Sequence, residues 1–438
     1  MSEELAVFLI YGTPMLVIFL FYIRGFRKKH KKNLGIKVEA IRDGLTEPAS
    51  LHPIVNPIRC IGCGSCVAAC PEKEVLGLVH NKAELISPTQ CIGHGACKVV
   101  CPTGAIKLVF GTERRGLDLP EVAPNFETNV PGVFVAGELG GMGLIRNAIE
   151  QGRQAMDSVR ERLKKSRPTG SDVLDVLIIG AGPAGFSATL SAMENKMRYV
   201  TVEQDSLGGT VSHYPRGKLV MTAPAILPLV GKVKFTETSK EELMDFWTGV
   251  AKKFNVRINY KERVESIDQT SGYFNIKTTK KTYKSRSVLL AIGRRGTPRK
   301  LGVTGEDKSK VVYRLIDPEQ YRNKHVLVVG GGDSALEAAW SIAELGSPVT
   351  LSYRSEAFSR AKKKNRLKVE EMEQTGTLKT LMKSNVKSIN DDSVDITLAN
   401  GSVKRIKNDG VIVCAGGILP TGFLKDIGIQ VITKYGTE

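Results

Sequence analysis

The chain has 438 residues, which is too long for one ordinary core at about 150 residues per domain. Hydrophobic residues make up 42% and charged residues 25%, and this balance excludes a disordered or low-complexity protein. The net charge of +18 favours an anionic partner, but no zinc-finger or heptad pattern would place a helix in a groove, so we expect no nucleic-acid binding.

The first 24 residues predict a membrane anchor. Residues 5–23 carry no charge and, at about 1.5 Å per helical residue, are long enough to cross a hydrocarbon core. Glutamates precede this stretch and a cluster of cations follows it, which is the reverse of a signal peptide. Because cytoplasmic flanks attract Lys and Arg, we expect a single-pass inner-membrane protein with cytoplasmic catalytic domains and a basic juxtamembrane linker over residues 25–50.

Residues 51–108 contain two runs of metal-ligating residues with the same spacing, each followed by proline. The first run is Cys60, Cys63, Cys66 and Cys70, and the second is Cys91, His94, Cys97 and Cys101. Cytoplasmic thiols are kept reduced, so the spacing favours iron–sulfur ligation over disulfides. The segment resembles a bacterial two-cluster ferredoxin, and this resemblance implies a small α+β domain that holds [4Fe-4S] clusters.

The resemblance also implies that the last cysteine of each run crosses to the other cluster. The first cluster then takes Cys60, Cys63, Cys66 and Cys101, and the second takes Cys70, Cys91 and Cys97. His94 stands where the pattern has cysteine. Three alternatives stay open at the second site: imidazole ligation of the fourth iron, a [3Fe-4S] cluster, or no cluster. Replacing a thiolate by neutral imidazole would raise the reduction potential.

An apolar run from residue 175 leads into a first glycine-rich turn and a helix-like segment. Gly180 permits the tight turn, Gly182 lets a pyrophosphate approach, and Gly185 lets the helix pack on the strand. Glu203 ends the next apolar run, where a carboxylate accepts bonds from ribose hydroxyls. Gly208 and Gly209 either bring backbone near the cofactor or form only a turn. The predicted binding residues are Gly180, Gly182, Pro183, Ala184, Gly185, Glu203, Gly208 and Gly209.

A second unit of this kind begins at His325, with an alanine at the third position of the turn. Its next strand ends at Ser352, Tyr353 and Arg354 without an acid. A cation there can pair with a 2′-phosphate, which an acid would repel, so we expect NADPH, with NADH as the alternative. The predicted binding residues are Gly330, Gly332, Asp333, Ser334, Ala335, Arg354 and Arg360.

Residues 171–438 resemble the thioredoxin-reductase-like flavoproteins, in which an NAD(P)H domain interrupts an FAD domain. The two glycine-rich turns, Ala291-Ile292-Gly293 and the segment DGVIVCAGGILP at 409–420 carry the resemblance. It implies two Rossmann-like, three-layer α/β domains: FAD-binding residues 171–299, NAD(P)H-binding residues 300–410, and a return into the FAD domain over 411–438. Ala291 and Gly293 join the predicted FAD site. The family is commonly dimeric, so a homodimer is an option.

The family closes with a third flavin motif, which does not follow residue 420 here and stands upstream instead. PGVFVAGELGGMGLIRNAIEQGRQA at 131–155 matches it, with Gly137 and Glu138 in place of its Gly-Asp. We therefore predict a circular permutation, in which residues 109–170 form the last segment of the FAD domain. The helix from about residue 144 would aim its positive end at the flavin.

Together these parts predict an FAD-dependent, membrane-anchored NAD(P)H oxidoreductase of the ferredoxin–NAD(P)H reductase type. A flavin can exchange electrons between a hydride carrier and one-electron clusters. The external redox partner could be a ferredoxin, a quinone, a cytochrome or a membrane complex, and the direction of flow is open. We expect no catalytic side chain.

Two alternatives follow from what the chain lacks. Residues 311–324, where the family carries its dithiol, contain no cysteine, and Cys414 is expected in the core. Bacillithiol-disulfide-reductase-like proteins also lack that dithiol, so an NADPH-dependent reductase of low-molecular-weight disulfides is the second hypothesis. A non-enzymatic redox sensor is the third.

Overall fold

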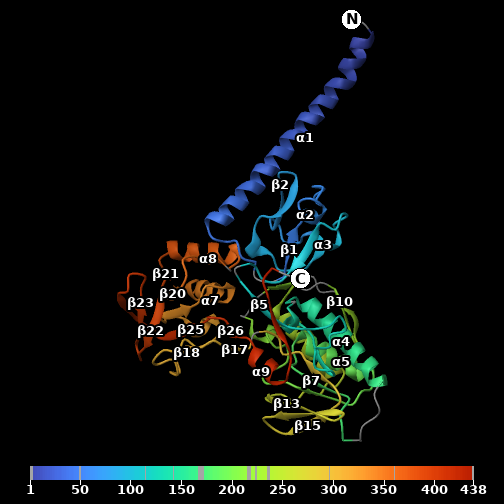
Figure 1. The fold of residues 1–438 in the computed structure, drawn as a ribbon. Helices are drawn as coiled ribbons and strands as arrows, with labels where there is room; N and C mark the ends of the chain where they lie inside the picture. Colours follow the sequence, from blue (N-terminus) through green and yellow to red (C-terminus); the bar gives the residue numbers. More distant parts are fainter. Residues whose placement is uncertain are drawn as a thin grey trace. The chain divides into compact units, whose positions relative to one another are not determined.

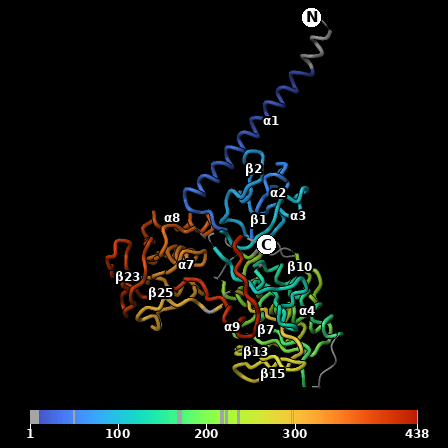
Figure 2. Tube along the Cα trace, in the orientation of Figure 1, coloured from blue at the N-terminus to red at the C-terminus, as the bar shows by residue number. Residues whose placement is uncertain are grey.

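The computed structural model describes residues 3–48, 51–113, 115–141, 143–165, 172–214, 219–221, 224–233, 237–294, 296–359 and 361–436 (Figures 1 and 2). Contacts divide the chain into two units, residues 1–109 and residues 110–437. The α/β class predicted from the sequence is confirmed by the alternation of strands and helices in the second unit.

The first unit contains a small α+β domain built from two strand pairs and two short helices. β1 (His52–Val55) pairs antiparallel with β4 (Ile106–Val109), and β2 (Leu76–Val79) pairs antiparallel with β3 (Lys82–Leu85). The helices α2 (Ser65–Ala69) and α3 (Ala96–Val99) each follow a cysteine-rich loop, and the turn η1 (Pro88–Gln90) precedes the second loop. Three cysteines, Cys60, Cys66 and Cys97, belong to the buried core of this domain.

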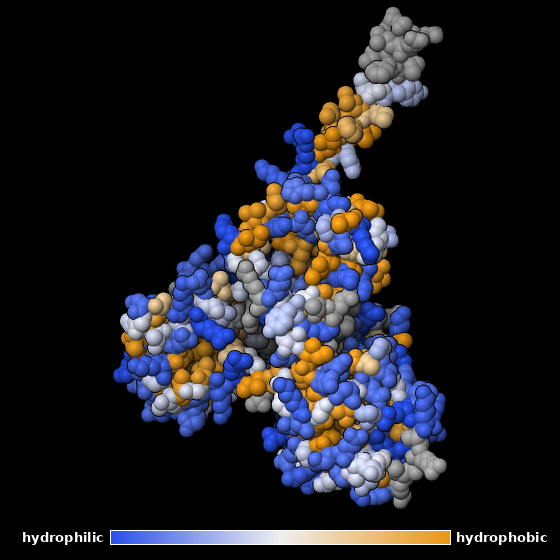
Figure 3. All heavy atoms as spheres, viewed as in Figure 1, coloured by the Kyte–Doolittle hydropathy of each residue, from blue (hydrophilic) through white to orange (hydrophobic). Residues whose placement is uncertain are grey.

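A long helix precedes this domain. α1 runs from Glu3 to Arg42, so the predicted linker over residues 25–50 is helical for most of its length. Its second half packs on the domain: Asn33 Nδ2 donates to the Leu78 carbonyl at 3.1 Å, and Lys37 pairs with Glu84. Residues 11–22 expose large apolar side chains (Figure 3). Among the helices of the described ranges, none is long and apolar enough to cross a membrane, which leaves the anchor predicted over residues 1–24 unsupported.

A four-stranded parallel sheet organises the first half of the second unit. Its order is β6 (Val133–Val135), β16 (Val288–Leu290), β7 (Val176–Ile179) and β8 (Tyr199–Val202). Strands β6, β16 and β7 are wholly apolar and buried, as strands covered on both faces must be. The helices α4 (Ile145–Lys165) and α5 (Pro183–Glu194) pack closely on each other beside this sheet. Strand β6 therefore brings residues upstream of the first glycine-rich turn into the same sheet as that turn.

Smaller elements surround this sheet. The three-stranded meander comprises β13 (Val264–Thr270), β14 (Tyr273–Thr278) and β15 (Thr282–Ser285). Antiparallel pairs join β9 (Leu219–Met221) to β12 (Glu237–Ser239), β10 (Ala225–Leu227) to β11 (Gly231–Val233), and β5 (Leu117–Pro120) to β27 (Val431–Lys434). The remaining elements are η2 (Glu138–Gly140), η3 (Val211–His213), α6 (Lys240–Lys253) and α9 (Thr421–Asp426). The pairing of β5 with β27 links the two sequence ends of the second unit.

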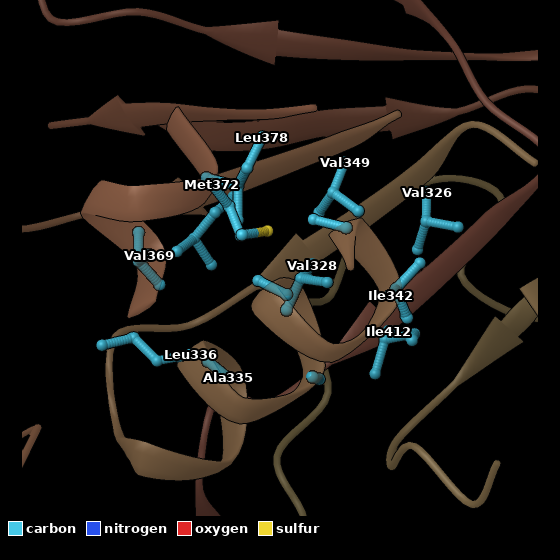
Figure 4. Close-up of a cluster of buried hydrophobic side chains, with 14 of the residues drawn as sticks. Val326, Val328, Ala335, Leu336, Ile342, Val349, Val369, Met372, Leu378 and Ile412 are labelled. Carbon is cyan, nitrogen blue, oxygen red and sulfur yellow. The ribbon is translucent and has the colours of Figure 1, made fainter. Parts of the chain in front are cut away.

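A second parallel sheet follows all four strands of the first in sequence. Its order is β18 (Val311–Val312), β25 (Gly410–Val413), β19 (Val326–Val329), β20 (Val349–Tyr353) and β21 (Leu378–Met382). The helices α7 (Asp333–Ala343) and α8 (Lys363–Gln374) contribute to its core, in which Ile342, Val328 and Met372 lie close together (Figure 4). The other elements are β17 (Thr297–Pro298), η4 (Pro318–Tyr321), β22 (Asn385–Ile389), β23 (Ser393–Thr397), β24 (Val403–Lys407) and β26 (Gly417–Ile418).

Candidate functional site

The eight predicted metal ligands line two separate cavities in the small domain. Cys60, Cys63, Cys66 and Cys101 line the first, and Cys70, Cys91, His94 and Cys97 line the second. Each cavity thus takes three residues from one run and the last cysteine of the other, as the crossed pattern predicts. Within the described residues, no three Cys, His, Asp or Glu side chains could hold a single metal ion. An iron–sulfur cluster differs from a single ion because its ligands bind different irons.

Glycines shape the two loops that carry these ligands. Gly62 and Gly64 in the first loop, and Gly93 and Gly95 in the second, all have φ between 71° and 77°. A Cβ at Gly62 would lie 2.2 Å from the carbonyl oxygen of Asn81, so no larger residue fits there. These positive φ values let each loop fold back around its cavity.

The thiols are in different electrostatic surroundings. Burial raises the pKa of Cys97 to about 11, and burial also raises the pKa of Cys66 and Cys91. A hydrogen bond with the Ser65 hydroxyl lowers the pKa of the exposed Cys63. Thiolates are the form that binds iron, so loading the buried cysteines requires release of their protons.

Backbone N–H groups also reach two of the sulfurs. Ala83 N donates to Cys60 Sγ at 3.4 Å, and Ala105 N donates to Cys101 Sγ at 3.3 Å. Hydrogen bonds of this kind to cluster sulfurs stabilise negative charge and tune reduction potentials. Both sulfurs line the first cavity, so the residues present there fit a four-iron cluster.

The second unit contains a cavity of about 1160 Å³ at the carboxyl ends of the four-stranded sheet. Ten of the predicted FAD-binding residues line it: Gly137, Glu138, Gly180, Gly182, Pro183, Ala184, Glu203, Gly209, Ala291 and Gly293. The amino ends of α4 and α5 border the same cavity, and their partial positive charge favours an anionic ligand. A dinucleotide with a pyrophosphate matches this combination of size and charge.

Two of the predicted glycines, Gly185 and Gly208, do not line the cavity and have structural roles. A Cβ at Gly185 would lie 1.9 Å from the Gly180 carbonyl oxygen, so its role is the close packing of α5 on the turn. Gly208 N donates to the Ala181 carbonyl at 2.9 Å, which makes this residue part of a turn. The sequence left open whether Gly208 and Gly209 form only a turn or also line the cofactor site. In the structure Gly208 is part of a turn, whereas Gly209 lines the cavity.

Glu203 directly follows β8, and its carboxylate is buried. One oxygen accepts from Ala181 N at 2.7 Å, and the other accepts from Asp205 N at 2.8 Å. Burial raises the pKa of Glu203, and these two backbone bonds act in the opposite direction by favouring the charged form. The same oxygens have further lone pairs with which to accept ribose hydroxyls.

Gly137 and Glu138 lie between β6 and α4, and both line the cavity. Gly137 has φ 84°, and its N–H donates to Gln151 Oε1 of α4 at 2.9 Å. Burial lowers the pKa of Arg294, while the carboxylates of Glu138 and Asp118 act to raise it. Glu138 therefore lies close enough to a half-buried guanidinium to compensate part of its charge.

The second glycine-rich turn has the expected backbone. Gly330 has φ 143°, and a Cβ there would meet Cys414 O at 2.4 Å and Ala335 Cβ at 3.1 Å, so the alanine fills the third position of the turn. Asp333 Oδ1 accepts from Lys362 N and from Asn365 Nδ2, both at 2.8 Å. Asp333 therefore binds the start of α8.

The other predicted residues of this turn differ in their surroundings. Gly332 precedes α7 as its N-cap, and Ser334 lies in its first turn, where its carbonyl is 3.8 Å from Cys414 Sγ. Arg354 is exposed just after β20, and Arg360 lies outside the described residues. Cys414 is half-buried at the edge of the core, and the expectation that it is fully buried was wrong.

Comparison with known proteins decides the family. Residues 177–436 match the family model described as pyridine nucleotide-disulphide oxidoreductase. The chain belongs to this family. Residues 52–102 match a 4Fe-4S dicluster domain. This oxidoreductase is therefore an FAD-dependent NAD(P)H enzyme with an iron–sulfur domain.

Its relatives include two kinds of reductase. Bacilliredoxin reductase Bdr of Bacillus subtilis is 29% identical over 266 residues, 59% of this chain and 82% of the relative. A ferredoxin–NADP reductase of Sulfurisphaera tokodaii is 31% identical over 265 residues, 58% of this chain and 74% of the relative. Among solved structures, bacillithiol disulfide reductase Bdr from Bacillus cereus is 25% identical with a TM-score of 0.52, over 58% of this chain and 81% of that one.

Sequence reasoning missed a charged cluster that borders the oxidoreductase's FAD cavity. Asp205 pairs with His213 Nε2 at 2.8 Å, with Lys261 at 2.9 Å and with Arg314 at 3.9 Å. Asp205, His213 and Arg314 also line the cavity. No sequence motif relates these four positions, so the cluster becomes visible only in the folded chain.

Proposed function

We propose that this oxidoreductase passes electrons between NADPH and an external one-electron carrier by way of its iron–sulfur domain. The observation that carries the proposal is the pair of four-ligand cavities on the same chain as an FAD-type cradle. The lack of cysteine in residues 311–324 argues against a dithiol as the electron outlet. The direction of electron flow depends on the reduction potential of the external carrier relative to that of NADPH.

The chain's own residues would hold and orient the cofactors. The backbone at Gly180 and Gly182 would receive the FAD pyrophosphate, and Glu203 would accept the ribose hydroxyls. The amino end of α4, with Gly137 and Glu138, would face the flavin. FAD, when bound, supplies the exchange between a two-electron hydride and single electrons. In the small domain, the seven motif cysteines would supply thiolates to iron.

The surface around the first cavity suits a transient protein partner. Cys63 is exposed, and Ile61, which lines the first cavity beside it, is 66% exposed. A small one-electron protein that docks here would meet the cluster edge nearest to solvent.

We further propose that the FAD domain is circularly permuted relative to the family. Supporting this, β6 pairs in parallel with β16, β5 pairs with β27, and a Cβ at Gly152 of α4 would lie 2.1 Å from the Ala184 carbonyl oxygen of α5. Residues 110–165 thus supply two strands, a helix and cavity residues to the fold. The inner-membrane location and a homodimer stay predictions of the sequence.

The preference for NADPH rests on Arg354, which follows β20 without an acid at the strand end. An ion pair with the 2′-phosphate contributes about 1.5–3 kcal/mol, so Arg354→Ala should lower kcat/KM for NADPH about 10- to 100-fold. The value for NADH should stay unchanged, and Lys383→Ala, at a lysine paired with Glu356, is the control. Equal losses with both nucleotides would refute the preference.

An anaerobic NADPH titration of the purified protein, followed by EPR and visible absorbance, tests the electron route. We expect NADPH to bleach the flavin and then to give the EPR signal of reduced clusters. Cys60→Ser and Cys101→Ser should abolish the EPR signal of the first cluster while flavin bleaching by NADPH persists. Failure of NADPH to reduce any cluster would contradict the proposal.

A reductase of low-molecular-weight disulfides is the second candidate, favoured by the similarity to bacillithiol disulfide reductase Bdr from Bacillus cereus over 81% of that chain. In this reaction, NADPH and a proton would convert one disulfide into two thiols. Disulfide-dependent NADPH oxidation that survives Cys60→Ser and Cys101→Ser would favour this candidate over the iron–sulfur route.

A further inference from the structure

One histidine, His94, lines the second cavity, and the backbone that carries it has the same conformation as the backbone that carries Cys63 in the first. Gly64, just after Cys63, and Gly95, just after His94, both have φ 77° and ψ 1°, and each precedes a short helix. Cys63 lines the first cavity and His94 lines the second. The two loops therefore present a thiol in one case and an imidazole in the other from equivalent positions.

One nitrogen of the His94 imidazole is buried and has no hydrogen-bond partner among the described residues. Among the described residues, Nε2 of His94 makes no hydrogen bond and has almost no contact with solvent. A buried polar atom left unsatisfied costs about 1–3 kcal/mol, so proteins rarely retain one without a role. The three cysteines that share its cavity, Cys70, Cys91 and Cys97, make no hydrogen bond that would satisfy this nitrogen.

Glu72 is the other non-sulfur side chain on this cavity that could bind iron. It follows the Cys70-Pro71 pair and does not occupy a position of the repeated spacing. Its carboxylate oxygens are not among the buried unpartnered atoms of the described residues, in contrast to the His94 nitrogen. The unsatisfied ligand at this cavity is therefore the imidazole.

We propose that Cys70, Cys91, Cys97 and Nε2 of His94 together bind a four-iron cluster in the second cavity. The neutral imidazole would give its Nε2 lone pair to the fourth iron and keep its proton on Nδ1. The inference rests on the proposed iron–sulfur domain and is independent of the NADPH chemistry. Because imidazole brings one negative charge fewer than thiolate, the second cluster has a higher reduction potential than a four-cysteine version of the same site.

The test uses the full chain labelled with ¹⁵N-histidine and reduced by dithionite, so that NADPH turnover plays no part. We expect iron and sulfide equivalent to two four-iron clusters, and a pulsed-EPR spectrum with a directly bound ¹⁵N on one of them. His94→Cys should retain both clusters, lose the nitrogen coupling and lower the midpoint potential of the second cluster. His94→Ala should give the signal of a three-iron cluster after oxidation.

Glu72→Gln is the matched control, because it changes the other candidate ligand in the same cavity. It should leave the nitrogen coupling and the cluster content unchanged. Three results would overturn the inference: a wild-type three-iron signal, iron sufficient for only one cluster, or two intact clusters without nitrogen coupling. Loss of the coupling in Glu72→Gln with retention in His94→Cys would also overturn it. Since none of these readouts uses NADPH, they remain informative if the proposed electron route fails.

Discussion

At the scale of single residues, Glu203 is the clearest test of the FAD cradle. Its carboxylate is buried to 7% exposure and holds two backbone N–H groups. Glu203→Gln keeps the size of the side chain but replaces one acceptor oxygen by an NH₂ donor. The variant therefore loses the negative charge and one of the two oxygens that accept backbone N–H bonds. Loss of a charge-assisted bond costs about 1.5–3 kcal/mol, so FAD affinity should fall about 10- to 100-fold.

Flavin fluorescence during titration of the deflavinated protein measures that affinity. Asp268→Asn changes an exposed carboxylate on β13 and serves as the control. Unchanged affinity in Glu203→Gln would remove Glu203 from the FAD site.

Tyr283 gives the fold a pH dependence in the alkaline range. Its hydroxyl donates to Glu262 at 2.9 Å and accepts from Asn259 Nδ2 at 2.8 Å. Burial, followed by the bond to Glu262, raises the pKa of Tyr283 to about 12. Between pH 10 and about 12 the folded protein keeps a proton that the unfolded chain has lost, so the free energy of unfolding falls as pH rises through this window.

Tyr283→Phe removes both the hydrogen bonds and this titration. The variant should unfold with about 1–3 kcal/mol less free energy at pH 8 and show a shallower decline above pH 10. Urea unfolding between pH 8 and 11 measures both quantities, with Tyr273→Phe on the neighbouring strand as the control. An unchanged slope above pH 10 would contradict the assignment.

At the scale of elements, two helix glycines form a matched pair. A Cβ at Gly152 of α4 would lie 2.1 Å from the Ala184 carbonyl oxygen, whereas a Cβ at Gly249 of α6 would meet nothing within 4 Å. Gly152→Ala should therefore lower the free energy of unfolding by about 1–3 kcal/mol through overpacking. Gly249→Ala should raise it by up to about 1 kcal/mol, because alanine favours helix.

Urea unfolding at neutral pH separates the two outcomes. If Gly152→Ala were as stable as the parent, the close packing of α4 on α5 would be wrong, and with it the support for residues 110–165 as part of the FAD domain.

Features that depend on local sequence could be predicted, whereas features made by tertiary contacts could not. The glycine-rich turns were predictable because each depends on local spacing: Gly180 and Gly330 need their φ values within one short turn. The crossed arrangement of the cysteines was available only through the resemblance to two-cluster ferredoxins, because it joins two separate runs. The salt bridges of Asp205 with Lys261 and Arg314 were not predictable, since three separate elements bring them together. The extent of α1 was also missed, because its second half is held by a tertiary contact of Asn33 with Leu78.

At the scale of the whole molecule, the second unit should survive a break in its chain. A protease site inserted within residues 166–171 would separate residues 110–165 from the rest of the FAD fold. Because β6 pairs with β16 and β5 pairs with β27, the two fragments should stay together and keep FAD after cleavage. Size-exclusion chromatography with flavin absorbance follows the outcome.

Gly152→Val in the same cleavable protein is the comparison, since it opens the packing of α4 against α5. It should release the upstream fragment together with the flavin. Separation of the fragments in the parent protein without denaturant would show that residues 110–165 form an independent domain.

The order in which the strands are synthesised affects how the second unit can fold. The small domain precedes the second unit in the chain, so it leaves the ribosome before the strands of the second unit are made. Strand β6, with Phe134 wholly buried in the finished protein, then leaves the ribosome long before its partner β16 exists. Until β16 is made, the apolar strand β6 has no partner and is exposed to aggregation, so we expect folding of the nascent chain to depend on chaperones.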